Sequence, residues 1–126
     1  MVIRSPLEVV AGPQGIGRAP GTERRAVLLT GASGVVGRAL LQRLRDLDVV
    51  CLVHRSPVSE PGVTTVQGDI REPMLGLARQ AYAALAAEVD VVIHCAAVTE
   101  FYRTNASLEA TNIAGTGHVA AFAAAA

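Results

Sequence analysis

The chain contains no lysine: all 11 of its basic residues are arginine, and 11 acidic residues balance them to a formal net charge of zero. Any mechanism that needs a catalytic lysine is therefore excluded for this chain alone. The neutral balance predicts neither a nucleic-acid nor a membrane partner, and no apolar run approaches the roughly 20 residues that cross a bilayer. The two cysteines, Cys51 and Cys95, have neither disulfide-framework nor metal-ligand spacing, so we expect no metal site.

The chain is long enough for one domain, with 126 residues of which 51% are hydrophobic. Residues 1–24 stand apart because prolines and glycines recur there and no helical or alternating pattern persists. We expect them to be a flexible leader. Since this leader has no apolar stretch of the secretory kind, we also expect a cytoplasmic location. The folded domain is then expected over residues 25–126.

Short apolar runs alternate with helical patterns after residue 25. We expect strands at 26–30, 49–53, 63–66 and 90–95, and helices at 35–47, 77–88 and 105–125. This alternation predicts an α/β fold of Rossmann type, with a parallel sheet and helices on both of its faces. Right-handed crossovers would place the strands in the spatial order 3-2-1-4, which is an incomplete version of that fold.

A glycine-rich loop follows the first expected strand and begins the first expected helix. It reads Thr30, Gly31, Ala32, Ser33, Gly34, Val35, Val36, Gly37. In this position it predicts a dinucleotide-binding loop, in which Gly31 permits the turn, Gly34 lets the backbone approach a pyrophosphate and Gly37 lets the helix pack on the sheet. The alternative is a tight turn with accidental glycines. A second glycine cluster at 12–17 has no apolar helix after it and is not expected to bind nucleotide.

The end of the second strand carries an arginine, Arg55, and no acid. An acid there would hold the ribose 2′-hydroxyl of NAD, whereas an arginine would pair with a 2′-phosphate. The sequence therefore favours NADPH over NADH, with Arg38 as a second phosphate ligand; the alternative is that both arginines are solvated surface residues. After the third strand, Asp69 is placed to accept from the adenine, unless it is a simple turn aspartate.

These residues, with Ile70 after Asp69 and with Cys95, Ala96 and Ala97 after the fourth strand, resemble the extended short-chain dehydrogenase/reductases. Segments 68–77 and 89–97 resemble the thioester-reductase branch more narrowly. That branch includes terminal reductase domains of nonribosomal peptide synthetases, carboxylic acid reductases and male-sterility-type fatty acyl reductases. The resemblance extends over about residues 26–118. It implies that residues 25–126 are the N-terminal portion of an NAD(P)-binding Rossmann domain.

The resemblance also implies roles for residues near the fourth strand. Cys95, Ala96 and Ala97 would line the adenosine and ribose, and Asn112 would tie the fourth-strand backbone to the active-site region. The alternative for Asn112 is a buried helix asparagine that is satisfied locally. His94 is expected to point into the sheet as a core histidine. The family's chemistry is hydride transfer from NADPH to a thioester or aldehyde carbonyl, assisted by a Ser or Thr, a Tyr and a Lys.

The catalytic Tyr-x-x-x-Lys pair of that family is absent. Alanines, Ala86 and Ala106, stand four residues after Tyr82 and Tyr102. We therefore expect no catalytic residue here, and the fourth strand is expected to be an open sheet edge. The main hypothesis is the cofactor-binding half of an NADPH-dependent reductase, a fragment or truncated product that is inactive alone and takes an acyl thioester or carbonyl substrate only in a longer form.

Three alternatives stay open at this point. The first is a split enzyme, in which a complementing chain supplies the missing strands and the Ser, Tyr and Lys. The second is a non-enzymatic NADP(H)-binding sensor. The third is a fragment of an NAD-dependent sugar-nucleotide epimerase or dehydratase, which Arg55 and the segment 69–77 disfavour.

Overall fold

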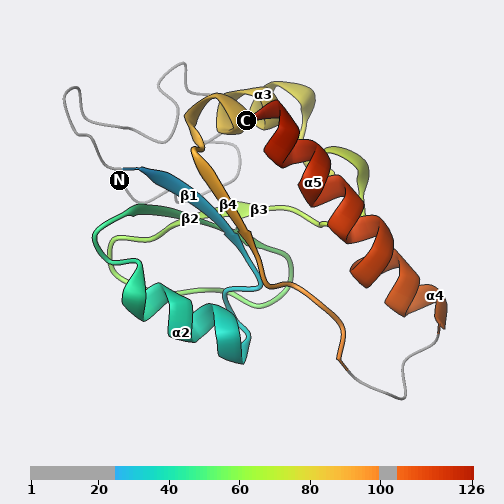
Figure 1. Cartoon of the computed structure of the whole chain (residues 1–126), viewed down its shortest axis with the longest axis horizontal. Coiled ribbons are helices and arrows are strands. Elements are labelled where there is room, and N and C mark those ends of the chain that lie inside the picture. Colours follow the sequence, from blue (N-terminus) through green and yellow to red (C-terminus); the bar gives the residue numbers. More distant parts are fainter. Residues whose placement is uncertain (1–24, 100–104) are drawn as a thin grey trace.

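A computed structural model describes residues 25–99 and 105–126 (Figure 1). Its elements are β1 (Ala26–Thr30), α2 (Val35–Arg43), β2 (Asp48–Val53), β3 (Thr64–Gln67), η1 (Pro73–Gly76), α3 (Arg79–Glu88), β4 (Val91–His94), α4 (Asn105–Leu108), η2 (Glu109–Ala114) and α5 (Gly115–Ala125). The leader and the glycine cluster at 12–17 lie outside the described residues, as does Tyr102. No helix in the described ranges is long and apolar enough to cross a bilayer.

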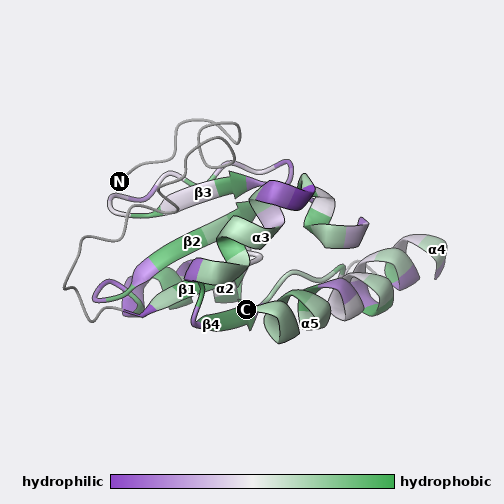
Figure 2. Cartoon of the chain, turned by 90° about the horizontal axis from the view of Figure 1, so that it is seen from above, coloured by the Kyte–Doolittle hydropathy of each residue, from purple (hydrophilic) through white to green (hydrophobic). Residues whose placement is uncertain are grey.

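The four strands form one parallel sheet in the order β3-β2-β1-β4, which confirms the predicted fold class and strand order. Figure 2 shows the strands following one another in that order across the sheet. The central strand, β1, pairs Leu28 with Val50 on one side and with Val92 on the other. Because all pairs are parallel, the carboxyl ends of the strands meet at one edge, where the connecting loops gather.

Side chains alternate between the two faces of the sheet, and the inner strands β1 and β2 are buried on both faces. Leu28 and Val50 belong to the core shared with α3 and α5, whereas Leu29 and Cys51 belong to the core under α2. Figure 1 shows α2 on one side of the sheet and α3 and α5 on the other. Burial raises the pKa of the Cys51 thiol to about 11, so this cysteine stays protonated and acts as a packing group.

Two helix boundaries differ from the predicted ones. The first helix ends at Arg43 and not at residue 47, because the amide of Leu47 donates to the carbonyl of Leu44 in a turn. Both leucines still pack against the α2 core, which is why their spacing resembled a longer helix. The second helix begins at Arg79, after a separate 3-10 turn that the sequence pattern did not indicate.

The third helix spans the predicted residues but is not uniform. Its middle, η2, is a π-helical segment between α4 and α5. π-Helical turns are rare inside α-helices and often lie at functional sites. On the sheet itself, β4 pairs only with β1 among the described residues, and Val91 is 37% exposed. The fourth strand is therefore an open edge in this part of the chain, as expected.

Candidate functional site

A cavity of about 430 Å³ opens at the carboxyl ends of the strands, beside the point where the strand order reverses between β1 and β4. Open parallel sheets bind ligands at this kind of position. The predicted site residues that line it are Thr30, Gly31, Ala32, Ser33, Gly34, Arg55, Asp69, Ile70, Cys95, Ala96 and Ala97. The fold thus brings together residues from all four strand ends.

Five predicted residues do not line this cavity: Val35, Val36, Gly37, Arg38 and Asn112. Val35 and Val36 lie on the first turn of α2 and are 88% and 62% exposed. Gly37 is buried beneath the loop, and Arg38 is exposed on α2. Arg38 thus lies outside the cavity wall, and its role as a second phosphate ligand stays a prediction.

The loop glycines show distinct steric demands. Gly31 has a φ of +75°, and a Cβ there would lie 2.5 Å from the amide nitrogen of Ala96. At Gly37 a Cβ would lie 2.0 Å from the carbonyl oxygen of Gly31. At Gly34 the nearest atom would be 3.4 Å away, so the fold itself tolerates a side chain there. Gly31 and Gly37 are thus needed by the protein's own packing, whereas Gly34 keeps the backbone open toward the cavity.

A hydrogen-bonded series of side chains crosses the back of the site. Thr30 is buried, and its Oγ1 lies 2.6 Å from Nδ1 of His94 and accepts from the amide of Ala96 at 3.3 Å. Nε2 of His94 lies 3.3 Å from Oγ1 of Thr116 on α5. Burial lowers the pKa of His94 below its ordinary value. His94 is satisfied as expected, but it is half-buried and connects β1 to α5 instead of pointing into a closed core.

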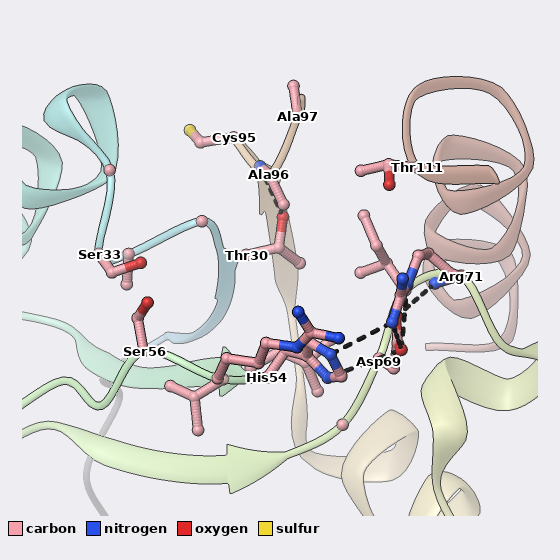
Figure 3. A pocket seen from close by; sticks show the side chains of 18 of the residues that line it. Thr30, Ser33, His54, Ser56, Asp69, Arg71, Cys95, Ala96, Ala97 and Thr111 are labelled. Atoms are coloured by element: carbon pink, nitrogen blue, oxygen red, sulfur yellow. Dashed lines mark hydrogen bonds and ion pairs between the residues drawn. The ribbon is translucent and has the colours of Figure 1, made fainter. Parts of the chain in front are cut away.

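Asp69 is held by Arg71, which lies two residues further along the chain. Its carboxylate accepts from Nη2 of Arg71 at 2.7 Å, from Nε at 3.0 and 3.1 Å, and from the backbone amide of Arg71 at 2.9 Å. Hydrogen bonding to the Arg71 side chain is the main cause that lowers the pKa of Asp69 to about 2, against the opposing effect of burial. Figure 3 shows this pair with His54, whose Nδ1 is 3.6 Å from Oδ2 of Asp69.

A left-handed turn supports the backbone of Asp69. Met74, Leu75 and Gly76 have φ values of 55°, 57° and 67°. Left-handed backbone costs about 1–2 kcal/mol for a residue with a Cβ, and the complete burial of Leu75 opposes that cost. The carbonyl of Leu75 accepts from the amide of Asp69 at 2.9 Å, so the turn anchors the residue that follows β3.

Asn112 is anchored to the segment that follows β4. Its side-chain oxygen accepts from the amide of Val98 at 2.8 Å, and its Nδ2 donates to the carbonyl of Val98 at 2.9 Å. The side chain is exposed, so the buried, locally satisfied alternative does not describe it. Asn112 lies in the π-helical segment, and its neighbour Thr111 lines the cavity.

About half of the cavity wall was not among the predicted site residues: Leu52, Val53, His54, Ser56, Val58, Gly68, Arg71, Val98, Ser107 and Thr111. A signal existed for His54 and Ser56, because they flank Arg55 at the same strand end. No local signal indicated Ser107 or Thr111, which reach the site from the last helix, far along the chain.

The chain matches known proteins at the level of the family, of sequence relatives and of solved structures. The model of the male sterility protein family matches residues 58–126, more than half of the chain. The hybrid PKS-NRPS synthetase pvhA of Talaromyces variabilis is 39% identical over 100 residues, which are 75% of this chain and 2% of the synthetase.

Two reductase domains are similar in structure. The terminal R domain of the myxalamid PKS-NRPS pathway superposes with a TM-score of 0.72 at 29% identity, covering 82% of this chain and 32% of that domain. The reductase domain of a non-ribosomal peptide synthetase from Mycobacterium tuberculosis gives a TM-score of 0.61 at 30% identity, covering 94% and 33%. The chain therefore belongs to the male sterility protein family, in the thioester-reductase branch of the extended short-chain dehydrogenase/reductases, and corresponds to the N-terminal part of such domains.

Proposed function

We propose that this chain is the NADPH-binding part of a thioester reductase and that it binds the cofactor without turning it over alone. The observation that carries the proposal is the cavity at the strand-order reversal, which the glycine loop, Arg55 and Asp69 all line. The described relatives support it because they are PKS-NRPS synthetases or their reductase domains. The chain spans about a third of those domains, so the activity of a whole reductase is part of the proposal.

The loop has the features that a pyrophosphate requires. The first turn of α2 carries no acidic residue, and its N-cap, Gly34, makes no side-chain capping bond. The amides at the positive end of the helix dipole are therefore not satisfied by a cap and meet no competing negative charge. Gly34 keeps the approach to them free of a side chain.

The rest of the cavity would hold the 2′-phosphate, the adenine and the ribose of the cofactor. Arg55 at the end of β2 would pair with the 2′-phosphate, because a guanidinium binds phosphate well and no acid follows this strand. Asp69 and Ile70 would contact the adenine. The small residues Ala96 and Ala97 would let the ribose lie close to the backbone after β4.

Bound NADPH would supply a hydride to the carbonyl carbon of a thioester or aldehyde. This chain would bind and orient the dinucleotide, but it has no Tyr-x-x-x-Lys pair to hold and protonate the oxygen that becomes negative. The proton donor must then come from a further segment, either of a longer form or of a complementing chain. We accordingly expect binding without turnover.

The first test is the binding of NADPH and NADH to the whole chain, measured by calorimetry. Gly34→Ala should weaken NADPH binding by about tenfold, equal to about 1.4 kcal/mol, because its Cβ occupies the approach to the loop amides. The matched control is Gly117→Ala, whose Cβ has nothing within 4 Å. A chain that binds neither dinucleotide, or a Gly34→Ala variant that binds NADPH as well as the wild type does, would contradict the proposal.

A second test separates the hypotheses about activity. NADPH oxidation is followed with an acyl thioester, first with the chain alone and then with a second polypeptide that contains Tyr-x-x-x-Lys. Turnover that occurs only when both polypeptides are present supports a split enzyme. NADPH binding that no second polypeptide converts into turnover supports a sensor. Oxidation by the chain alone would refute the inactivity, and binding of UDP-sugar with NAD would move the chain to the epimerase branch.

A further inference from the structure

The corner of the cavity between β2 and β3 contains an acid even though none follows β2. Asp69 comes after β3, yet its Oδ2 lies 3.6 Å from Nδ1 of His54, which follows β2 directly. The carboxylate is therefore next to the strand end from which dinucleotide-binding folds contact the ribose 2′ position. Its low pKa, about 2, keeps it ionised at neutral pH. An unpaired negative charge at this corner would repel a 2′-phosphate.

Arg71 is the residue that offsets this charge. Its Nε and Nη2 both donate to the carboxylate of Asp69, the latter at 2.7 Å, and Nη2 also lies 3.2 Å from Nε2 of His54. The Arg71 side chain is 40% exposed and that of Asp69 only 16%. The guanidinium thus covers the carboxylate on the exposed side of the pair, and both residues line the cavity (Figure 3).

We propose that Arg71 is a specificity-determining residue: by pairing with Asp69 it cancels the carboxylate's charge, so that the positive charge of Arg55 decides whether a 2′-phosphate is accepted. With the pair intact, the summed charge of Arg55, Asp69 and Arg71 is positive. Without Arg71 it is zero. This inference rests on the proposed NADPH binding. It explains that binding by the pairing of Asp69 with Arg71, in addition to the absence of an acid after β2.

The test compares two probes, 2′,5′-ADP and ADP, which differ only in the 2′-phosphate. Their dissociation constants for the whole chain give a preference ratio. Arg71→Gln should lower the preference for 2′,5′-ADP about fivefold, because the pair is partly exposed and screened by solvent, while ADP binding changes little. Adding Asp69→Asn to that variant should restore the preference, since it removes the uncovered charge.

Arg79→Gln is the matched control, because Arg79 is an exposed arginine at the start of α3 and does not line the cavity. Circular dichroism verifies that each variant folds. The fivefold loss should also shrink as salt is raised, since it is electrostatic. An equal loss of both probes in Arg71→Gln, or a lost preference that Asp69→Asn does not restore, would overturn the inference.

The two levels of the hypothesis fail in different ways. If the wild type binds neither probe and no NADPH, the proposed function is wrong and this inference falls with it. If the wild type prefers 2′,5′-ADP but Arg71→Gln leaves the ratio unchanged, the proposed function stands and only the role of Arg71 is refuted.

Discussion

The hydroxyl of Thr30 lies 2.6 Å from Nδ1 of His94, and this contact joins the ends of two neighbouring strands at the back of the cavity. Because Oγ1 of Thr30 accepts from the amide of Ala96, its hydrogen is left to donate to Nδ1. Nε2 then carries the proton and donates to Thr116, whose hydroxyl donates in turn to the carbonyl of Asn112. Burial, which lowers the pKa of His94, favours the neutral imidazole, and this network fits it with Nδ1 as acceptor and Nε2 as donor.

This arrangement predicts that stability decreases on mild acidification. Burial lowers the pKa of His94, so the unfolded chain takes up a proton at a higher pH than the folded chain does. The contribution of His94 is therefore fully present above its ordinary value of about 6.5 and is lost as the pH falls toward the folded value. Denaturant unfolding of the wild type and of His94→Gln between pH 7.5 and 5.5 should show the steeper decrease in the wild type. Parallel curves would contradict the assignment.

Gly37→Ala should unfold or strongly destabilise the protein. The new Cβ would lie 2.0 Å from the carbonyl oxygen of Gly31 and 2.7 Å from Cα of Ala32, and neither backbone atom can move without displacing the loop. We expect a loss of about 3 kcal/mol in the free energy of unfolding. Thermal unfolding of Gly37→Ala and of Gly34→Ala, whose Cβ meets no such clash, measures the difference in stability. Equal melting temperatures for the two variants would show that the loop adapts.

Gly117→Ala should stabilise the chain by up to about 1 kcal/mol, because alanine is the better helix former and nothing lies within 4 Å of the new Cβ. Gly115→Ala should gain less, since its Cβ would lie 2.9 Å from Cδ1 of the buried Ile70. Chemical denaturation of the two variants tests the order. A larger gain at Gly115 would mean that α5 does not pack against Ile70 as the structure shows.

Asn112→Asp should loosen the segment after β4. The change keeps an acceptor for the amide of Val98 but replaces the donor that bonds the Val98 carbonyl with a second oxygen. The expected cost is about 1 kcal/mol, in keeping with one lost hydrogen bond at an exposed site. Amide hydrogen exchange at residues 96–99 should accelerate in this variant, and less in Asn112→Gln. Unchanged exchange would show that the bond to the carbonyl contributes nothing.

Much of the fold follows from patterns that are local in the sequence. The continuous apolar run Ala26–Thr30 predicted a strand buried on both faces, and the structure has that strand with the same bounds at the centre of the sheet. The strand order followed because right-handed crossovers leave few arrangements of such units. Gly31 and Gly37 were identified because the demands they meet, a left-handed turn and a close approach of helix to sheet, recur wherever this loop occurs.

The charge and shape of the cavity were decided by contacts that no local pattern encodes. Nothing in the spacing of Asp69 and Arg71 says that the arginine folds back onto the carboxylate, or that Met74 and Leu75 adopt left-handed backbone beneath it. Thr111 and Ser107 reach the cavity from the last helix, far along the chain.

The last helix is placed by long-range packing. Gly115 lies against Ile70, and Nδ1 of His118 is 2.7 Å from the carbonyl oxygen of Ile70. Hydrophobic period and glycine spacing are properties of short segments, so the sequence by itself determined the strands, their order and the glycine-rich loop. The rotation of a helix and the partner of a charged side chain depend on surfaces that meet only after folding, so the tertiary structure alone decided which side chains form the cavity wall.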